Sequence, residues 1–154
     1  MRLPLILLAL MVPLAATAME KLTGEQINRA FTGNTVSGRY TGGGFFTEFH
    51  DPDGRALGNN GWQENRDACW ITKGDSVCYY YGPPGERTTH CFTVELTDRL
   101  YILRNLDNGR INAVATIELA NPRNHTDGGK PWYCDGLISR GPQGPLMSRR
   151  VAAW

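Results

Sequence analysis

The sequence of 154 residues contains none of the short motifs that mark common catalytic centres. There is no Gly-x-Ser-x-Gly elbow, no His-Glu-x-x-His pair and no phosphate-binding Gly-x-x-x-x-Gly-Lys. A Cys-x-x-Cys pair is also missing, and with it the ligand set of a zinc ribbon, a thioredoxin-type centre or a covalent haem site. We therefore predict no catalytic residue, no metal ligand and no cofactor. An enzyme is the third alternative, behind two kinds of binding protein.

The chain also lacks a strong net charge. Its 16 Lys and Arg balance 15 Asp and Glu, which gives a formal charge of +1. A nearly neutral chain is poorly suited to electrostatic capture of nucleic acid or of an anionic membrane surface. We expect neither as a partner.

No apolar run reaches the roughly 20 residues that a membrane-spanning helix needs. The run from Leu3 to Leu14 follows Arg2 and precedes Ala16-Thr17-Ala18, the small-x-small pattern that a signal peptidase cleaves. We interpret residues 1–18 as a signal peptide. The mature chain is then expected to start at Met19 and to be periplasmic or secreted, with no transmembrane segment.

Composition favours an all-β fold with many turns, because the chain has 18 Gly and 9 Pro beside 4 Trp, 6 Tyr and 5 Phe. One helix is expected first: Thr23 to Gln26 fits a capping box, Ile27 and Phe31 follow on one face, and Gly33 provides a left-handed stop. Eight strand-like runs follow, at Thr35 to Thr41, Gly44 to His50, Arg55 to Gly58, Ala68 to Lys73, Ser76 to Tyr81, Thr88 to Leu96, Arg99 to Arg104 and Arg110 to Leu119.

Short turns join these runs and indicate an up-and-down meander. Asp-Gly and Asn-Gly tolerate positive φ at both central positions, which makes Asp53-Gly54 and Asn108-Gly109 strong hairpin signals. About eight strands can close into a small calycin-like or streptavidin-like barrel, with an open sandwich as the alternative. We assign this barrel and its N-terminal helix to residues 19–121. Residues 122–154 are rich in Gly and Pro and are expected to form an irregular tail.

Four cysteines in an exported chain are expected to form disulfides, since thiols persist mainly in reducing compartments. If the turn between the fifth and sixth strand-like runs centres on Pro84-Gly85, Cys78 lies directly opposite Cys91. We predict this cross-strand bond, although four cysteines allow other connectivities. Cys69 with Cys134 follows by subtraction and would hold the tail on the barrel.

The same register sorts the side chains of this hairpin by face. One face is apolar and aromatic and carries Tyr79, Tyr81 and His90 together with Val77, Phe92 and Val94. The cysteines lie on the other face, whose side chains are mostly small and polar. We predict that Tyr79, Tyr81 and His90 bind a ligand inside one end of the barrel. The alternative is that His90 is a core histidine bonded to Tyr79.

Two other groups of residues offer weaker candidates. His50-Asp51-Pro52-Asp53-Gly54 holds a histidine and two carboxylates that suit a metal, but this pattern also forms an ordinary turn, which we favour. Glu48 with Asp51 is a conceivable pair of carboxylates for glycoside hydrolysis, although their spacing does not fix their separation. In the tail, Trp132 and Tyr133 stand beside Cys134 in a polar stretch, as an anchor or as a contact for a protein partner.

The order of these features resembles a group of small exported proteobacterial proteins of unknown function. The similarity rests on Phe31-Thr32-Gly33-Asn34-Thr35, the Asp-Gly hairpin, Trp70 before Gly74-Asp75, and the strand pairs Cys78-Tyr79 and Cys91-Phe92, and it covers roughly Leu22 to Pro122. The resemblance implies an exported bacterial protein with the Cys78 to Cys91 bond. It implies no activity and no site.

Two functions therefore stay open. The first is a carrier or sensor whose barrel takes a small apolar or aromatic ligand near Tyr79, Tyr81 and His90. The second is an interaction module, such as an inhibitor of an extracytoplasmic hydrolase, that uses loops or the tail.

Overall fold

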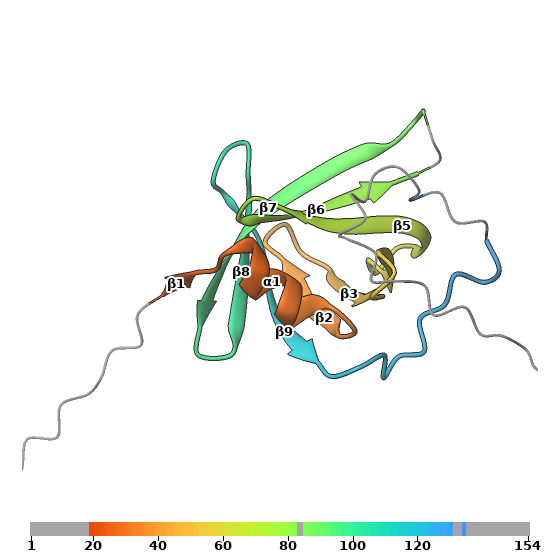
Figure 1. The fold of residues 1–154 in the computed structure, drawn as a ribbon, viewed down its shortest axis with the longest axis horizontal. Coiled ribbons are helices and arrows are strands. Elements are labelled where there is room, and N and C mark those ends of the chain that lie inside the picture. Colours follow the sequence, from red (N-terminus) through yellow and green to blue (C-terminus); the bar gives the residue numbers. More distant parts are fainter. Residues whose placement is uncertain (1–18, 83–84, 131–133, 135–154) are drawn as a thin grey trace, which may run out of the picture.

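The computed structural model describes residues 19–82, 85–130 and 134. Its fold is all-β, with a closed eight-stranded antiparallel barrel, one further short strand and one short helix (Figure 1). The predicted signal peptide and the residues Trp132 and Tyr133 lie outside the described residues. The elements are β1 (Glu20–Lys21), α1 (Gly24–Phe31), β2 (Thr35–Tyr40), β3 (Phe45–His50), β4 (Arg55–Asn59), β5 (Glu64–Lys73), β6 (Ser76–Tyr81), β7 (Thr88–Thr97), β8 (Leu100–Asn105) and β9 (Ile111–Glu118).

The barrel is an up-and-down meander, as predicted. Strands β2 to β9 each pair with the next strand in the chain, and β9 pairs with β2 to close the ring. Strand β7 is long enough for two neighbours on one edge: its first half pairs with β6, and Glu95 and Leu96 pair with β1. Because the ring is closed, the alternative of an open sandwich is wrong. Closure also provides hydrogen-bond partners for backbone groups that an edge strand would expose.

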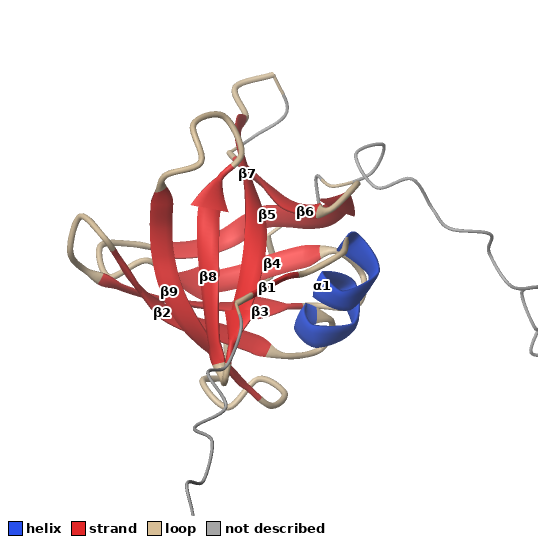
Figure 2. Cartoon of the chain, turned by 90° about the vertical axis from the view of Figure 1, so that its left-hand side faces the viewer, coloured by secondary structure: helices blue, strands red, loops and turns tan. Residues whose placement is uncertain are grey.

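Helix α1 closes one end of the barrel. Thr23 caps it, since its side chain accepts a hydrogen bond from the Gln26 backbone N–H and the Gln26 side chain accepts from the Thr23 backbone N–H. Ile27 and Phe31 are fully buried in the barrel core. The Phe31 ring contacts the ring of His50, where β3 ends. Figure 2 shows the helix against the strands, and we call this end the closed end.

Both predicted disulfides are present. Cys78 faces Cys91 across β6 and β7, and Cys69 of β5 bonds Cys134, 65 residues later in the chain. The outer face of β6 differs from expectation, because Cys78 is only 1% exposed instead of facing solvent. The Cys78 side chain is bonded through its sulfur to Cys91 on the neighbouring strand β7.

The segment after β9 is held on the outside of the barrel. Between residues 119 and 130 the structure has no helix or strand. His125 hydrogen-bonds the Thr47 hydroxyl at 2.9 Å, Asp127 forms an ion pair with Arg55, and Lys130 forms one with Asp67 at 3.2 Å. Together with the disulfide at Cys134, these contacts fasten the segment to β3, β4 and β5.

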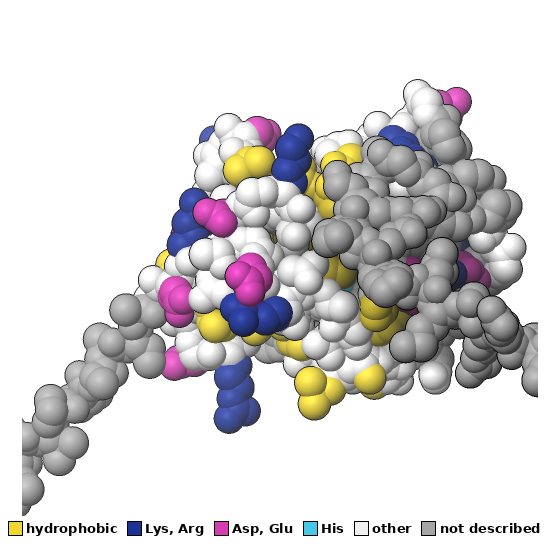
Figure 3. Space-filling view, viewed as in Figure 1, with side chains coloured by type: hydrophobic (Ala, Val, Ile, Leu, Met, Phe, Trp, Pro, Cys, Tyr) yellow, Lys and Arg dark blue, Asp and Glu magenta, His cyan; other side chains and the backbone are white. Residues whose placement is uncertain are grey.

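The surface carries no extended area of one charge in the view of Figure 3, where acidic and basic side chains alternate over the described residues of this face. The ion pairs of the described residues include Arg104 with Glu95 at 2.9 Å and Arg123 with Glu118 at 2.7 Å. Within the described part of the chain, no helix has the length and apolar character needed to cross a membrane.

Candidate functional site

The barrel interior is filled at the closed end and hollow toward the other. The alternation of each strand places every second side chain inside. Near α1 the interior is occupied by His50, Trp70, Val77 and Val94, all of them buried. Toward the opposite end lies a cavity of about 340 Å³, which we call the barrel cavity. Its lining residues are Tyr40, Phe46, Glu48, Asn60, Gln63, Asn65, Tyr79, Tyr81, Thr88, His90, Phe92, Leu103 and Asn112.

The lining has a definite chemical pattern. Aromatic rings form much of the wall, in particular Tyr40 stacked on Phe46 at 4.8 Å and Tyr79 stacked on Tyr81 at 6.2 Å between ring centroids. Neutral amide side chains from the β4–β5 loop, from the start of β5 and from the start of β9 stand near the mouth, and these are Asn60, Gln63, Asn65 and Asn112. The cavity therefore offers ring faces along its wall and hydrogen-bonding groups at its mouth.

Among the described residues, Glu48 is the one carboxyl group of the lining. Strand β3 directs Phe46, Glu48 and His50 inward, and Glu48 is only 6% exposed. The Tyr81 hydroxyl donates to its carboxyl group, at 3.1 Å from Oε1. Burial raises the pKa of Glu48 to about 7, and the hydrogen bond from Tyr81 opposes this shift in part.

Gly58 makes the backbone around this carboxyl possible. It lies opposite Glu48 across β3 and β4, at an irregularity in the pairing of β4 with β5. A Cβ at this position would come within 2.2 Å of the Thr47 carbonyl oxygen, so the two strands approach more closely than a side chain permits. Because Gly58 has no side chain, it also leaves space beside the carboxyl group of Glu48.

A second polar pair closes the interior below the cavity. The Nε2 atom of His50 lies 2.7 Å from the Tyr79 hydroxyl, and both side chains are buried. Burial lowers the pKa of His50 to about 3, so the imidazole is neutral near pH 7. The rings of Phe31 and Trp70 pack against this imidazole, with 4.9 Å between ring centroids in each case, and separate it from solvent.

The structure brings together all three residues predicted to bind a ligand. Tyr79 lies opposite His90 across β6 and β7, and Tyr79, Tyr81 and His90 all line the barrel cavity. His90 is exposed at the mouth, and its ring is 5.9 Å from that of Tyr81. The alternative of His90 as a core histidine bonded to Tyr79 is wrong. His50 makes this contact with Tyr79 instead, because it ends β3 beside Phe31 of α1.

Sequence reasoning missed Glu48 as an interior group. A glutamate within a strand usually marks a solvent face, and the sequence suggested a role for Glu48 only as a partner of Asp51. The alternation of Phe46, Glu48 and His50 was the signal that places all three on one face. Glu48 and Asp51 do not form a pair: Glu48 faces the cavity, whereas Asp51 lies beyond the end of β3.

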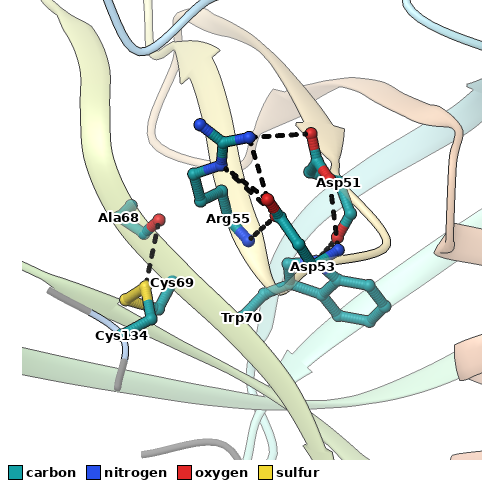
Figure 4. The surroundings of a disulfide bond; sticks show 7 residues. All are labelled: Asp51, Asp53, Arg55, Ala68, Cys69, Trp70 and Cys134. Carbon is teal, nitrogen blue, oxygen red and sulfur yellow. Dashed lines mark hydrogen bonds and ion pairs between the residues drawn. A yellow bond between two sulfur atoms is a disulfide. The ribbon is translucent and has the colours of Figure 1, made fainter. Parts of the chain in front are cut away.

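The segment from Asp51 to Gly54 is a turn, as favoured. Figure 4 shows Arg55 beside the carboxylates of Asp51 and Asp53, close to the disulfide of Cys69 with Cys134. Arg55 reaches Asp53 at 2.8 Å and Asp51 at 3.6 Å. These carboxylates are therefore engaged by a guanidinium group, and no cluster of three or more His, Cys, Asp or Glu within the described residues is arranged to hold a metal ion.

Comparison with known proteins found no match to this chain among protein-family models, curated proteins or solved structures. The resemblance to exported proteobacterial proteins therefore stays a prediction, and the function must be argued from the cavity.

Proposed function

We propose that this protein binds a small organic molecule inside its barrel and acts as an exported carrier or sensor. The observation that carries the proposal is the barrel cavity of about 340 Å³, with four aromatic or imidazole side chains of one hairpin and a buried carboxyl in its lining. Small-molecule sites have volumes of roughly 300–1,000 Å³ and combine apolar walls with a few oriented polar groups.

The architecture supports a container. Helix α1 and the packed layer around His50 close one end, so that a ligand enters and leaves between the loops of the other. The expected ligand is more polar than a purely apolar compound, because amide side chains and Glu48 share the wall of the cavity with the aromatic rings. A ligand with an aromatic or apolar body and at least one polar group fits this lining.

Export supports the same proposal. The two disulfides are consistent with an oxidising compartment, as is the signal peptide predicted for residues 1–18. A protein released into a periplasm or the medium can collect a diffusing compound there. The near-neutral charge fits a small ligand better than nucleic acid.

Binding is tested with variants of two neighbouring residues on β7. His90→Trp places a large ring in the cavity mouth, whereas Thr89→Trp places the same ring on the outer face of the strand. Native mass spectrometry of protein purified from its own host is expected to show an additional non-covalent mass on wild type and on Thr89→Trp, and to show a bare His90→Trp. A bare wild-type protein that no compound of a small-molecule panel stabilises against heat refutes the proposal.

The second candidate is a protein-interaction module, such as an inhibitor of an extracytoplasmic hydrolase. It is favoured by Trp62, which is 88% exposed in the β4–β5 loop, and by Phe45, which is 58% exposed at the start of β3. Exposed aromatic side chains are frequent anchors of protein interfaces. Trp62→Ala is expected to abolish inhibition of a hydrolase in this case and to leave a ligand in the cavity unaffected.

A further inference from the structure

We infer that the compound bound in the barrel cavity is a small organic ammonium ion, whose charged nitrogen lies against the carboxylate of Glu48. This inference rests on the proposed function and specifies the chemical class of the ligand. The inference has three requirements. The Glu48 carboxylate must form no ion pair with a cationic side chain, and the cavity wall must tolerate a cation. The charge of Glu48 must also be the dominant charge in the cavity.

Glu48 has no cationic partner among the described residues. Every ion pair found there joins other side chains, and the carboxyl group of Glu48 receives one hydrogen bond, from Tyr81. A carboxylate can accept about four hydrogen bonds. A buried carboxylate without a counter-ion is costly, so a cation that enters the cavity gains more from it than from a carboxylate in water.

The wall suits a cation with an apolar body. Tyr40 and Phe46 form one stacked pair, from β2 and β3, and Tyr79 and Tyr81 form another, on β6. Glu48 lies between these pairs, because it follows Phe46 on the inner face of β3 and bonds Tyr81 across the barrel. Aromatic faces attract ammonium groups when the site excludes water. The same rings provide contact area for the rest of the ligand.

The other lining groups do not compete for this role. Tyr79 and Tyr81 on β6 have pKa values well above the ordinary one, since they are buried, and burial raises the pKa of Tyr40 on β2 to about 12. These hydroxyls therefore stay neutral. Among the described lining residues, His90 on β7 is the remaining titratable group, and His50 lies below the cavity on β3, where it is neutral.

Binding of such a ligand is linked to a proton. Before the ligand binds, Glu48 has a pKa of about 7, because burial disfavours its charged form. An adjacent ammonium ion favours the charged form and lowers this pKa. Uptake near neutral pH therefore releases a proton from Glu48, and acidification expels the ligand. An alcohol of the same shape lacks this linkage.

The test compares two probes of nearly the same shape, 2-phenylethylamine and 2-phenylethanol, by titration calorimetry at about pH 8 and about pH 5.5. Wild type is expected to bind the amine at least about tenfold more tightly than the alcohol at the higher pH, and to lose most of that preference at the lower pH. Glu48→Gln is expected to remove the preference at both. Glu86→Gln, an exposed residue between β6 and β7, serves as the matched control and should behave as wild type.

The outcomes separate this inference from the proposed function. Equal binding of amine and alcohol to wild type, or a preference for the amine that survives Glu48→Gln, overturns the ammonium assignment while binding in the cavity stands. A pH dependence that disappears in His90→Gln overturns the proton linkage through Glu48. If neither probe binds, the inference fails, and the native mass of the purified protein decides the proposed function by itself.

Discussion

Replacing Glu48 by glutamine is expected to change how the stability of the protein, measured without added ligand, depends on pH. The pKa of this carboxyl is about 7 in the folded protein, against an ordinary value of 4.5. Between these two values the folded state binds more protons than the unfolded state, so the stability contributed by Glu48 falls as pH rises. One pKa unit corresponds to about 1.4 kcal/mol, so the full effect is about 3 kcal/mol.

His50 acts in the opposite direction. Its pKa falls from 6.5 to about 3 on folding, because the imidazole is completely buried. The unfolded chain therefore takes up a proton first as pH falls, and stability is lost progressively from about pH 6.5 to about pH 3. Between about pH 4.5 and 6.5 the two slopes are equal and opposite. The stability of wild type is then nearly level in this window, as far as these two groups determine it.

Glu48→Gln removes the contribution of Glu48 to the pH dependence of stability, so that the opposite contribution of His50 is no longer balanced. Its free energy of unfolding is expected to fall by about 3 kcal/mol relative to wild type as pH falls from 6.5 to 4.5. Urea denaturation followed by tryptophan fluorescence at closely spaced pH values measures this, with the exposed Glu86→Gln as control. A difference between wild type and Glu48→Gln that stays constant within 1 kcal/mol over this window refutes the reasoning. It would mean that water reaches the carboxyl and its pKa is ordinary.

Three further changes test the fold that surrounds the cavity. Replacing both Cys69 and Cys134 by alanine should cost about 4 kcal/mol of unfolding free energy, because their bond closes a loop of 65 residues in the unfolded chain; an unchanged urea midpoint contradicts this. Gly58→Ala should cost more than about 1 kcal/mol, since its Cβ overlaps a neighbouring strand, whereas Gly42→Ala has open space and should be neutral; equal melting temperatures contradict the close approach. Tyr79→Phe removes the hydroxyl that contacts the buried imidazole and should cost about 1–3 kcal/mol in thermal or urea unfolding; no loss would show that this hydrogen bond is not needed.

Local sequence signals predicted most of the secondary structure. The capping box at Thr23 starts α1, and the meander of eight strands follows the alternation and the turns. Strand β1 was missed, since two residues carry no periodicity and pair only with the far half of β7. Strand β5 begins at Glu64 instead of Ala68, because the polar stretch before Ala68 alternates toward the mouth of the barrel and toward solvent.

The candidate site was predicted in part. Tyr79, Tyr81 and His90 were found from the register of one hairpin, because facing positions across a tight turn are fixed by local geometry. Glu48 and Tyr40 come from strands far from that hairpin in the sequence. Their approach to it depends on closure of the barrel, which no single hairpin encodes.

The sequence by itself determined the helix start, the strand alternation, the pairing of Cys78 with Cys91 and the inward face of that hairpin, because these depend on neighbouring residues and on turn geometry. Only the tertiary structure decided that the interior is hollow at one end and that Glu48 is buried there. The volume of a cavity is what the inward side chains of eight strands together leave unfilled, and the pKa of a carboxyl depends on the water that those side chains exclude.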